Sequence, residues 1–337
     1  MRKRVQEDFF ERVGVISPNR VHISNHPLDT PRTVFNPALD FNGIDLIIYP
    51  RIIVGYYMYV SAIGKMEVPL SDVEDGSINY SHYSAKLVIL PQDAFDIWGA
   101  EDPRLTKMDD KNLIVYTGRT VNYFDPSKRS WRTSPVVAIE DNGEIKKVAV
   151  RKRDEVGVVS DKDAFVLVKD GRAYLFHRPH VIENGEEKFY MAISEIMNWS
   201  EIVNANETKE MELSEPIVKI YPEKWEERVG WGTPPIEVAP NTYLALAHAL
   251  DRKDMAYKAF LILFKLKGSE FELLGTSPGY VMTPITRYEI YGDRPMVVFP
   301  TGLVRVDNDV YVAYGAADAV IGLARADLSL LISLASP

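Results

Sequence analysis

The chain of 337 residues contains no cysteine, and this absence removes several classes of protein at once. Without a thiol there is no disulfide scaffold, no thiolate zinc site, no iron–sulfur cluster and no cysteine nucleophile. Basic residues are in the minority, because 39 Lys and Arg stand against 48 Asp and Glu, for a formal net charge of −9. An acidic chain is a poor bulk counterion for nucleic acid or for an anionic membrane, so neither is expected as a partner.

Several sequence signals are also missing. No apolar run approaches the roughly 18 to 20 residues that a membrane-spanning helix needs. The basic residues 2–4 are followed by polar and acidic residues, so no signal-peptide core is present. The six histidines show no zinc spacing, and neither a P-loop nor a G-x-S-x-G elbow occurs. We therefore expect a cytoplasmic protein with no metal site and no cofactor.

The composition that is present is that of an ordinary globular protein, with 46% hydrophobic and 26% charged residues. Aromatic residues make up 11% of the chain and include 18 tyrosines. This content favours a strand-rich protein that binds a ligand with polar and apolar faces, such as a sugar.

A weak internal repeat is the most informative pattern. Five segments begin with a polar or proline-containing stretch, continue into a short apolar strand and a polar turn, and end with a second apolar strand. The second strands end near Tyr49, Tyr116, Phe176, Ala247 and Tyr314, at intervals of 67, 60, 71 and 67 residues. This length suits one four-stranded blade per unit, and the turns carry Asn, Asp and Gly as hairpins require. The pattern predicts an all-β, five-bladed propeller, with a β-sandwich of coincidental spacing as the alternative.

The rest of the chain adds little regular structure to this prediction. Residues 5–13 have the apolar spacing of a short helix, so we predict a helical N-terminal extension within residues 1–30. Residues 192–203 fit a helix or blade strands equally well. No Pro/Ser/Gly-rich linker interrupts the five units, which predicts a single domain over residues 1–337.

The repeat also predicts where a site would form. In an antiparallel hairpin the start of the first strand and the end of the second lie at the same edge. In a radial arrangement these edges meet at one mouth of the central channel. The polar residues at those positions are Asn36, Arg51, Asp102, Arg119, Lys162, Asp163, Arg178, His248 and Asp318. A few carboxylates among several cations are typical of a pocket for a polar substrate.

Five motifs, in order, resemble those of glycoside hydrolase family 130, the mannoside phosphorylases. They are GAEDPR at 99–104, DKD at 161–163 with FHRP at 176–179, RVGWGTPP at 228–235, AH at 247–248 followed by Tyr257, and FPTG at 299–302 with YGAAD at 314–318. The resemblance extends from residue 36 to residue 324. The chain departs from the family pattern at Trp231, Ala247 and Ala249, which affects the expected substrate more than the expected chemistry.

The resemblance implies that Asp102 is the only catalytic acid. An isolated Asp before a proline is usually a turn residue. Within this motif it would instead protonate the leaving oxygen, passing its proton through the 3-hydroxyl of the mannosyl group. An inverting phosphorylase needs no carboxylate base, because phosphate is already an anionic nucleophile. Glu101, next to Asp102, is expected to point away by strand alternation and to be structural.

The cations form the predicted phosphate site. One such residue alone is more often a surface charge or an ion-pair partner. As a set they suit a dianion, because guanidinium groups bind phosphate through two donors and Lys adds a point charge. The predicted phosphate-binding residues are Lys162, Arg178, Arg228, His248 and Tyr257.

The predicted sugar-binding residues are Asn36, Arg51, Arg119, Asp163 and Asp318. For Asp163 and Asp318 a second interpretation is that they orient the neighbouring cations. Tyr116, Trp231 and Tyr314 are candidates for stacking on a sugar ring, although most propeller aromatics pack between blades.

The sequence thus predicts inverting phosphorolysis of β-1,4- or β-1,2-linked mannosides, with inorganic phosphate as co-substrate and α-mannose 1-phosphate as product. A β-mannoside hydrolase and a non-catalytic carbohydrate-binding propeller are the alternatives. The oligomeric state stays open, with the apolar face of residues 5–13 as a candidate surface for a homo-oligomer.

Overall fold

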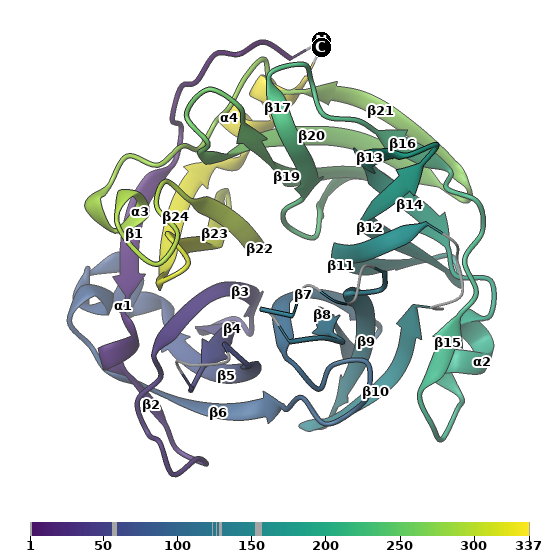
Figure 1. The fold of residues 1–337 in the computed structure, drawn as a ribbon. Coiled ribbons are helices and arrows are strands. Elements are labelled where there is room, and N and C mark those ends of the chain that lie inside the picture. Colours follow the sequence, from purple (N-terminus) through teal and green to yellow (C-terminus); the bar gives the residue numbers. More distant parts are fainter. Residues whose placement is uncertain are drawn as a thin grey trace.

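The computed structural model describes residues 2–55, 59–122, 124–125, 127, 130–151 and 157–336, and these residues form five small β-sheets arranged in a ring (Figure 1). Each sheet is one blade, built around the hairpin that the repeat predicts. The five-bladed propeller is therefore confirmed. Among the described residues, no helix has the length and apolar character needed to cross a membrane.

The strands are distributed over the blades as follows. Blade I contains β2 (Val21–Ile23), β3 (Thr33–Phe41), β4 (Asp45–Ile53), β5 (Ser61–Pro69) and β6 (Tyr83–Ile89). Blade II contains β7 (Ala100–Met108), β8 (Lys111–Arg119), β9 (Thr133–Asp141), β10 (Glu144–Arg151) and β15 (Lys209–Met211). Blade III contains β11 (Val158–Lys169), β12 (Arg172–Glu183), β13 (Glu186–Phe189), β14 (Met191–Glu195) and β16 (Val218–Ile220).

Blade IV contains β17 (Glu226–Trp231), β18 (Ile236–Ala239), β19 (Thr242–Asp251), β20 (Tyr257–Lys267) and β21 (Glu270–Thr276). Blade V contains β22 (Val298–Val306), β23 (Asp309–Ala316), β24 (Val320–Asp327) and β1 (Glu11–Ile16). The helices of the described residues are short: α1 (Leu70–Glu74), α2 (Trp199–Val203), α3 (Arg287–Ile290), α4 (Leu328–Ala335), and the 3-10 turns η1 (Pro18–Arg20) and η2 (Ser77–Asn79).

The predicted turns join the first two strands of the blades. Asp109, Asp170, Asn241 and Asp307 each have a positive φ, between 51° and 58°. Asn and Asp tolerate this left-handed conformation better than other residues with a side chain, and a tight hairpin requires it. The Asn and Asp residues that predicted these turns therefore occupy the left-handed positions at which the hairpins reverse direction.

The hydrophobic core is divided among the five interfaces between neighbouring blades. Five large clusters of buried apolar residues each combine side chains from two adjacent blades. Because both faces of most blades are covered, a strand such as β19 is buried along its whole length. The cores lie between the sheets, which leaves the polar ends of the inner strands free to form a site.

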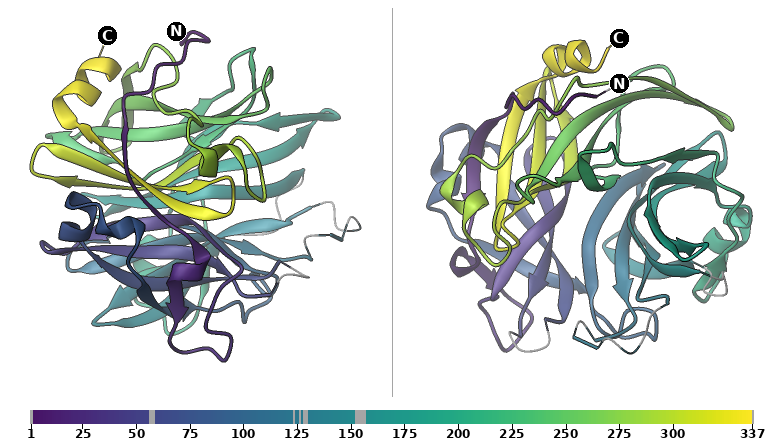
Figure 2. Two further views of the ribbon diagram at one scale, coloured as in Figure 1. Left: turned by 90° about the vertical axis from the view of Figure 1, so that its left-hand side faces the viewer. Right: turned by 45° about the horizontal axis from the view of Figure 1, so that its top comes forward.

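The N-terminal segment closes the ring, and the predicted helix at residues 5–13 is wrong. Residues 11–16 form β1, which pairs antiparallel with β24, so the two ends of the chain share blade V. Figure 2 shows the N-terminal segment running beside the C-terminal strands. Pairing with an open sheet edge outweighs a weak helical pattern of nine residues, because the edge supplies backbone partners that a short isolated helix lacks. Residues 192–203 combine both expectations, since β14 is followed by α2.

The three aromatic residues considered for sugar stacking belong to the core instead. Tyr116, Trp231 and Tyr314 are at most 1% exposed. The Trp231 indole packs against Phe165 and Phe176 and donates a hydrogen bond from Nε1 to the backbone oxygen of Ala192, at 3.1 Å. The unusual tryptophan therefore fills the interface between blades III and IV, and the stacking prediction is wrong for all three residues.

Candidate active site

A repeated irregularity at the mouth positions three of the predicted residues. The first strands of blades I, II and III each contain a bulge, and Asn36, Asp102 and Asp163 occupy it with φ of 45°, 50° and 53°. A bulge leaves residues out of the ladder and redirects their side chains. Pro37 and Pro103 follow at positions where no ladder donor is lost. The left-handed backbone conformation at the bulge therefore explains why Asn or Asp occupies this position, in addition to the polar side chain that each provides.

Asp102 has one oxygen that is held and one that is open. Its Oδ1 accepts hydrogen bonds from Nδ2 of Asn36, at 2.8 Å, and from a terminal nitrogen of Arg51, at 3.0 Å. No donor of the described residues reaches its Oδ2. The side chain is buried, with 6% exposure of the residue. A proton carried by this carboxyl therefore resides on Oδ2, which is the arrangement that an acid facing a substrate needs.

Glu101 lies beside the site, so the expectation that it points away is wrong. Its carboxylate accepts from Arg51, at 2.9 Å, and from both Nε and a terminal nitrogen of Arg119, at 2.8 and 3.1 Å. Burial acts to raise the pKa of Glu101, but the charges of Arg119 and Arg51 outweigh it and lower the pKa to about 2. The bulge at Asp102 interrupts the alternation of side chains, which is why the strand pattern misplaced its neighbour.

Asp163 is the centre of a second group of charges. It is fully buried, and its carboxylate contacts Nε of Arg178, a terminal nitrogen of Arg104 at 3.5 Å and Nε2 of His248 at 3.3 Å. Burial opposes ionisation, yet the charges of Arg178, His248 and Arg104 hold the pKa of Asp163 well below its usual range. These contacts favour the interpretation in which Asp163 orients the cations.

Blade IV brings His248 next to this group through an interrupted inner strand. The strand breaks at the glycine and prolines of residues 232–235, and the upstream part, β17, places Gly230 opposite His248. A Cβ atom on Gly230 would lie 2.5 Å from Nε2 of His248 and 2.7 Å from Oδ2 of Asp163. Only glycine permits this approach, so the motif glycine serves the geometry of the site.

The two ring nitrogens of His248 differ in their partners. Burial lowers its pKa, which favours the neutral imidazole, although Asp163 opposes this shift. Contact with the Asp163 carboxylate favours a proton on Nε2, while Nδ1 is buried and has no hydrogen-bond partner among the described groups. The ring of Tyr257 has its centre 5.8 Å away, and both rings pack on Phe299.

A cavity of about 530 Å³ opens beside these residues and is lined by cations. Its lining includes Arg119, Arg132, Lys162, His180, Glu187 and Arg228. Lys162 is directly opposite Arg178 in the ladder between β11 and β12. Burial and the charge of Arg178 lower the pKa of Lys162 to about 8. Nε of Arg228 is buried without a partner among the described groups. The cavity therefore has excess positive charge and suits an anion.

Asp318 completes the ring of predicted residues from blade V. It follows β23 in a left-handed conformation, with φ of 52°, directly after Ala317 with φ of 50°. Burial raises the pKa of Asp318 to about 6, although the charges of Arg294 and Arg51 oppose the rise. The structure thus gathers all the predicted residues at one end of the ring.

Arg104 is a buried residue beside the site that the prediction did not single out. It is fully buried and donates to the backbone oxygens of Asp102, Trp231 and Gly232, at 3.1, 3.0 and 2.7 Å. Its contact with Asp163 joins the two groups of charges across the channel. Burial lowers its pKa. Its place in the motif at residues 99–104 was the available signal, but only the structure shows that it links three blades.

Metal binding has no support from this geometry. Within the described ranges, no group of three or more His, Asp or Glu side chains is arranged to hold a metal ion. The arrangement consists of one partly open carboxyl among paired charges, next to a cavity of cations.

Comparisons with known proteins agree with the motifs and the fold. A family model described as β-1,4-mannooligosaccharide phosphorylase matches residues 1–336. The chain is 28% identical over 303 residues to a 1,2-β-oligomannan phosphorylase of Thermoanaerobacter sp. (strain X514), covering 86% of this chain and 88% of the relative. It is 26% identical over 284 residues to a β-1,2-mannobiose phosphorylase of the same organism, covering 80% and 78%.

A solved structure of β-1,2-mannobiose phosphorylase from Listeria innocua has the same fold, with a TM-score of 0.71, 16% identity, and coverage of 97% of this chain and 98% of that one. The match of the family model over almost the whole chain decides the family, and the fold and the order of the motifs agree with it. The chain belongs to glycoside hydrolase family 130, the family of mannoside phosphorylases.

Proposed function

We propose that the protein catalyses inverting phosphorolysis of β-mannosides, releasing α-mannose 1-phosphate, with Asp102 as the single acid. The observation that carries this proposal is the juxtaposition of one carboxyl with an open oxygen and a separate cavity of cations. The first is what protonation of a leaving oxygen needs, and the second is what an anionic nucleophile needs. The names of the two relatives favour β-1,2-linked mannose as the substrate, with the β-1,4 linkage as the alternative.

In the proposed reaction, an oxygen of hydrogen phosphate attacks the anomeric carbon from the face opposite the leaving sugar. The bond between that carbon and the glycosidic oxygen breaks, and the proton on Asp102 reaches the glycosidic oxygen through the 3-hydroxyl of the mannosyl group. The proton carried by the phosphate is then available to restore the acid. The same steps in reverse would synthesise a β-mannoside from mannose 1-phosphate and an acceptor sugar.

The phosphate set in this proposal is Lys162, Arg178, Arg228, His248 and Tyr257. Lys162 and Arg228 line the cavity, while Arg178 and His248 are held by Asp163. The unpartnered Nδ1 of His248 is an acceptor for the hydroxyl of hydrogen phosphate. Fixed donors of this kind lose little orientational freedom when the anion binds.

The sugar set is Asn36 and Asp318, with Arg51, Arg119 and Asp163 acting mainly through other residues. Arg51 and Arg119 already bind Glu101, which reduces their capacity for phosphate. Asp318 has no hydrogen bond from the described residues, so its oxygens are open to sugar hydroxyls. The cytoplasmic location, the single domain and a homo-oligomeric state stay predictions.

Hydrolysis is the second candidate, and the paired carboxylates disfavour it. An inverting hydrolase needs a second carboxylate to activate water. Glu101 and Asp163 are each held by two or more cations, so neither has an oxygen of high basicity. A hydrolase also has no use for a cavity of cations.

Phosphate dependence tests the proposal directly. The wild-type protein would be incubated with β-1,2-mannobiose in buffer with and without inorganic phosphate, and mannose 1-phosphate and mannose would be quantified separately. We expect equal amounts of mannose 1-phosphate and mannose with phosphate, and no cleavage without it. Release of mannose at an unchanged rate in phosphate-free buffer would establish a hydrolase. Saturable sugar binding without cleavage of either β-1,2- or β-1,4-mannobiose would establish a binding propeller.

A further inference from the structure

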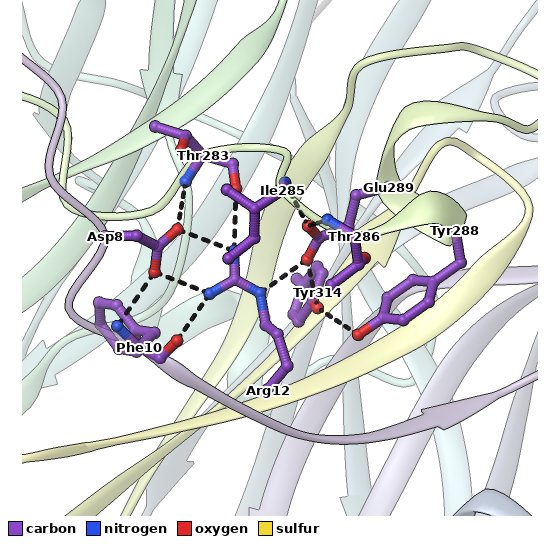
Figure 3. A network of polar contacts seen from close by, with 9 residues as sticks. All are labelled: Asp8, Phe10, Arg12, Thr283, Ile285, Thr286, Tyr288, Glu289 and Tyr314. Atoms are coloured by element: carbon purple, nitrogen blue, oxygen red, sulfur yellow. Dashed lines mark hydrogen bonds and ion pairs between the residues drawn. The ribbon is translucent and has the colours of Figure 1, made fainter.

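The segment between blades IV and V is anchored by a buried carboxylate. Glu289 of α3 accepts hydrogen bonds from Nε of Arg12 and from the hydroxyl of Tyr314, both at 2.7 Å. Its other oxygen accepts from the backbone nitrogens of Ile285 and Thr286, at 2.8 and 2.9 Å. Figure 3 shows these donors converging on Glu289 from three parts of the chain. The carboxylate is therefore fully engaged and fixes the start of the segment.

Arg12 extends this anchor to the N-terminal segment. Its guanidinium also donates to both oxygens of Asp8, at 2.8 and 2.9 Å, and to the backbone oxygen of Thr283, at 2.9 Å (Figure 3). Burial acts to lower the pKa of Arg12, but Asp8 and Glu289 outweigh it and raise the pKa above its ordinary value. The charged network thus joins β1, α3 and β23 into one rigid support.

The residues after α3 pack directly on the turn that carries Asp318. A Cβ atom on Gly292 would lie 2.6 Å from both the Cβ and the backbone oxygen of Ala317. The backbone nitrogen of Arg294 donates to the oxygen of Ala317, at 2.9 Å, and the nitrogen of Ala317 donates to Val297, at 3.1 Å. The position of Arg294 is therefore set by the same turn that sets Asp318.

The side chain of Arg294 reaches across to the neighbouring blade. Its guanidinium carbon lies 4.6 Å from the centre of the Tyr257 ring. The residue is exposed, and its guanidinium forms no hydrogen bond or ion pair with any residue that the structure describes. A guanidinium that packs over an aromatic ring can still donate from its N–H groups to another partner.

Arg294 therefore lies at the boundary between two groups of residues. On one side is Tyr257, next to His248 and within the electrostatic reach of Arg178. On the other side is Asp318, where burial raises the pKa and the charges of Arg294 and Arg51 oppose that rise. In the proposed function these are the phosphate side and the sugar side of the site. A donor at their boundary is placed to contact a ligand that occupies both sides.

We propose that Arg294 is a further binding residue of the site, recognising a sugar phosphate by donating to the phosphoryl group while the sugar occupies the Asp318 side. The inference rests on the proposed function and adds to it a residue outside the predicted motifs. In this proposal Arg294 donates to the phosphoryl group and not to the sugar, so it adds affinity for the sugar phosphate and not for mannose alone. A pairing of this kind between a charged donor and an oxyanion changes affinity by about tenfold or more.

Calorimetric titration of the full-length protein with α-mannose 1-phosphate tests the inference. Arg294→Met keeps an unbranched side chain over Tyr257 but removes the charge. Arg294→Lys keeps the charge but lacks the paired N–H donors of a guanidinium. Arg287→Ala is the matched control, since Arg287 is an exposed arginine of the same segment. We expect the dissociation constant to rise about tenfold or more for Arg294→Met and less for Arg294→Lys, with no change for Arg287→Ala.

The outcomes separate this inference from the proposed function. An affinity of Arg294→Met within twofold of the wild type would overturn the role of Arg294. A loss of affinity for free mannose as large as that for the sugar phosphate would also overturn it, because that result marks a general distortion of the site. Thermal unfolding of each variant checks for such distortion independently. If the wild type itself binds no mannose 1-phosphate and shows no phosphate-dependent cleavage, the proposed function fails instead.

Discussion

The two sides of the mouth use charge in opposite ways. On blades I and II every predicted cation is already matched, because Arg51 and Arg119 share Glu101 and Arg51 also holds Asp102. On blades III and IV a single carboxylate, Asp163, serves several cations, while Lys162 and Arg228 face an open cavity. The first side is neutralised and rigid, and the second has an excess of positive charge. The difference places the proposed acid and the proposed phosphate-binding residues in surroundings of different net charge.

Removing the acid is expected to have the largest effect. Asp102→Asn keeps the hydrogen bonds to Oδ1 but cannot donate the proton, so turnover should fall by about 10²- to 10⁴-fold. The rate of mannose 1-phosphate formation measures this loss. Asp109→Asn, in the turn at the opposite end of the same hairpin, is the control and should keep full activity. Substantial remaining turnover in Asp102→Asn would contradict the single-acid scheme.

Removing the shared carboxylate should increase the excess positive charge on blades III and IV. Asp163→Asn leaves Arg104 and Arg178 buried without their anion, which costs about 3 to 5 kcal/mol in the free energy of unfolding. Denaturant titration measures this cost, and Asp170→Asn in the exposed turn of the same hairpin should cost little. Retention of wild-type stability would mean that the cations are not held by Asp163.

Adding a side chain at Gly230 should disturb only the predicted phosphate-binding side of the site, on blades III and IV. Gly230→Ala places a methyl group within 2.7 Å of both His248 and Asp163, so one of them must move. A displacement of this size should lower kcat/KM by about 100-fold, mainly through the KM for phosphate. Gly55→Ala, where a Cβ meets no atom within 4 Å, serves as the comparison. An unchanged KM for phosphate would place the anion elsewhere.

The smallest expected effect is a pH dependence of phosphate binding. The pKa of Lys162 is lowered to about 8, so its ammonium is charged below that pH and loses its charge as the pH rises through it. The KM for phosphate should rise about tenfold between pH 7 and pH 9. Lys162→Arg, which stays charged, should flatten this rise. A rise of equal size in Lys162→Arg would exclude Lys162 as its source.

The sequence predicted those parts of the fold that depend on local chemistry. Turn residues such as Asp109 and Asp170 and the repeat spacing defined the hairpins, and the hairpins brought Asp102 and Lys162 to one end of the ring. It failed where a distant partner decides the conformation. Residues 5–13 have a helical pattern but meet β24, and Trp231 looks like a pocket residue but fills an interface between blades.

The site shows the same limit at three residues. Strand alternation placed Glu101 on the wrong side, because the left-handed Asp102 breaks the alternation. Arg104 and Arg294 were missed, since each contacts residues of other blades that no single motif contains. The repeat predicts which residues lie at the same end of the channel. It does not predict which of them form ion pairs with one another.

The closure of blade V by β1 has a consequence for how the protein is made. Glu11 and Arg325, which pair across this seam, are separated by 314 residues, so the ring cannot close until nearly the whole chain has left the ribosome. Until β24 is available, β1 lacks its partner strand, and bringing together strands so far apart in the sequence is slow. A product truncated before β24 would therefore carry Asp102 but lack the strand that pairs with β1.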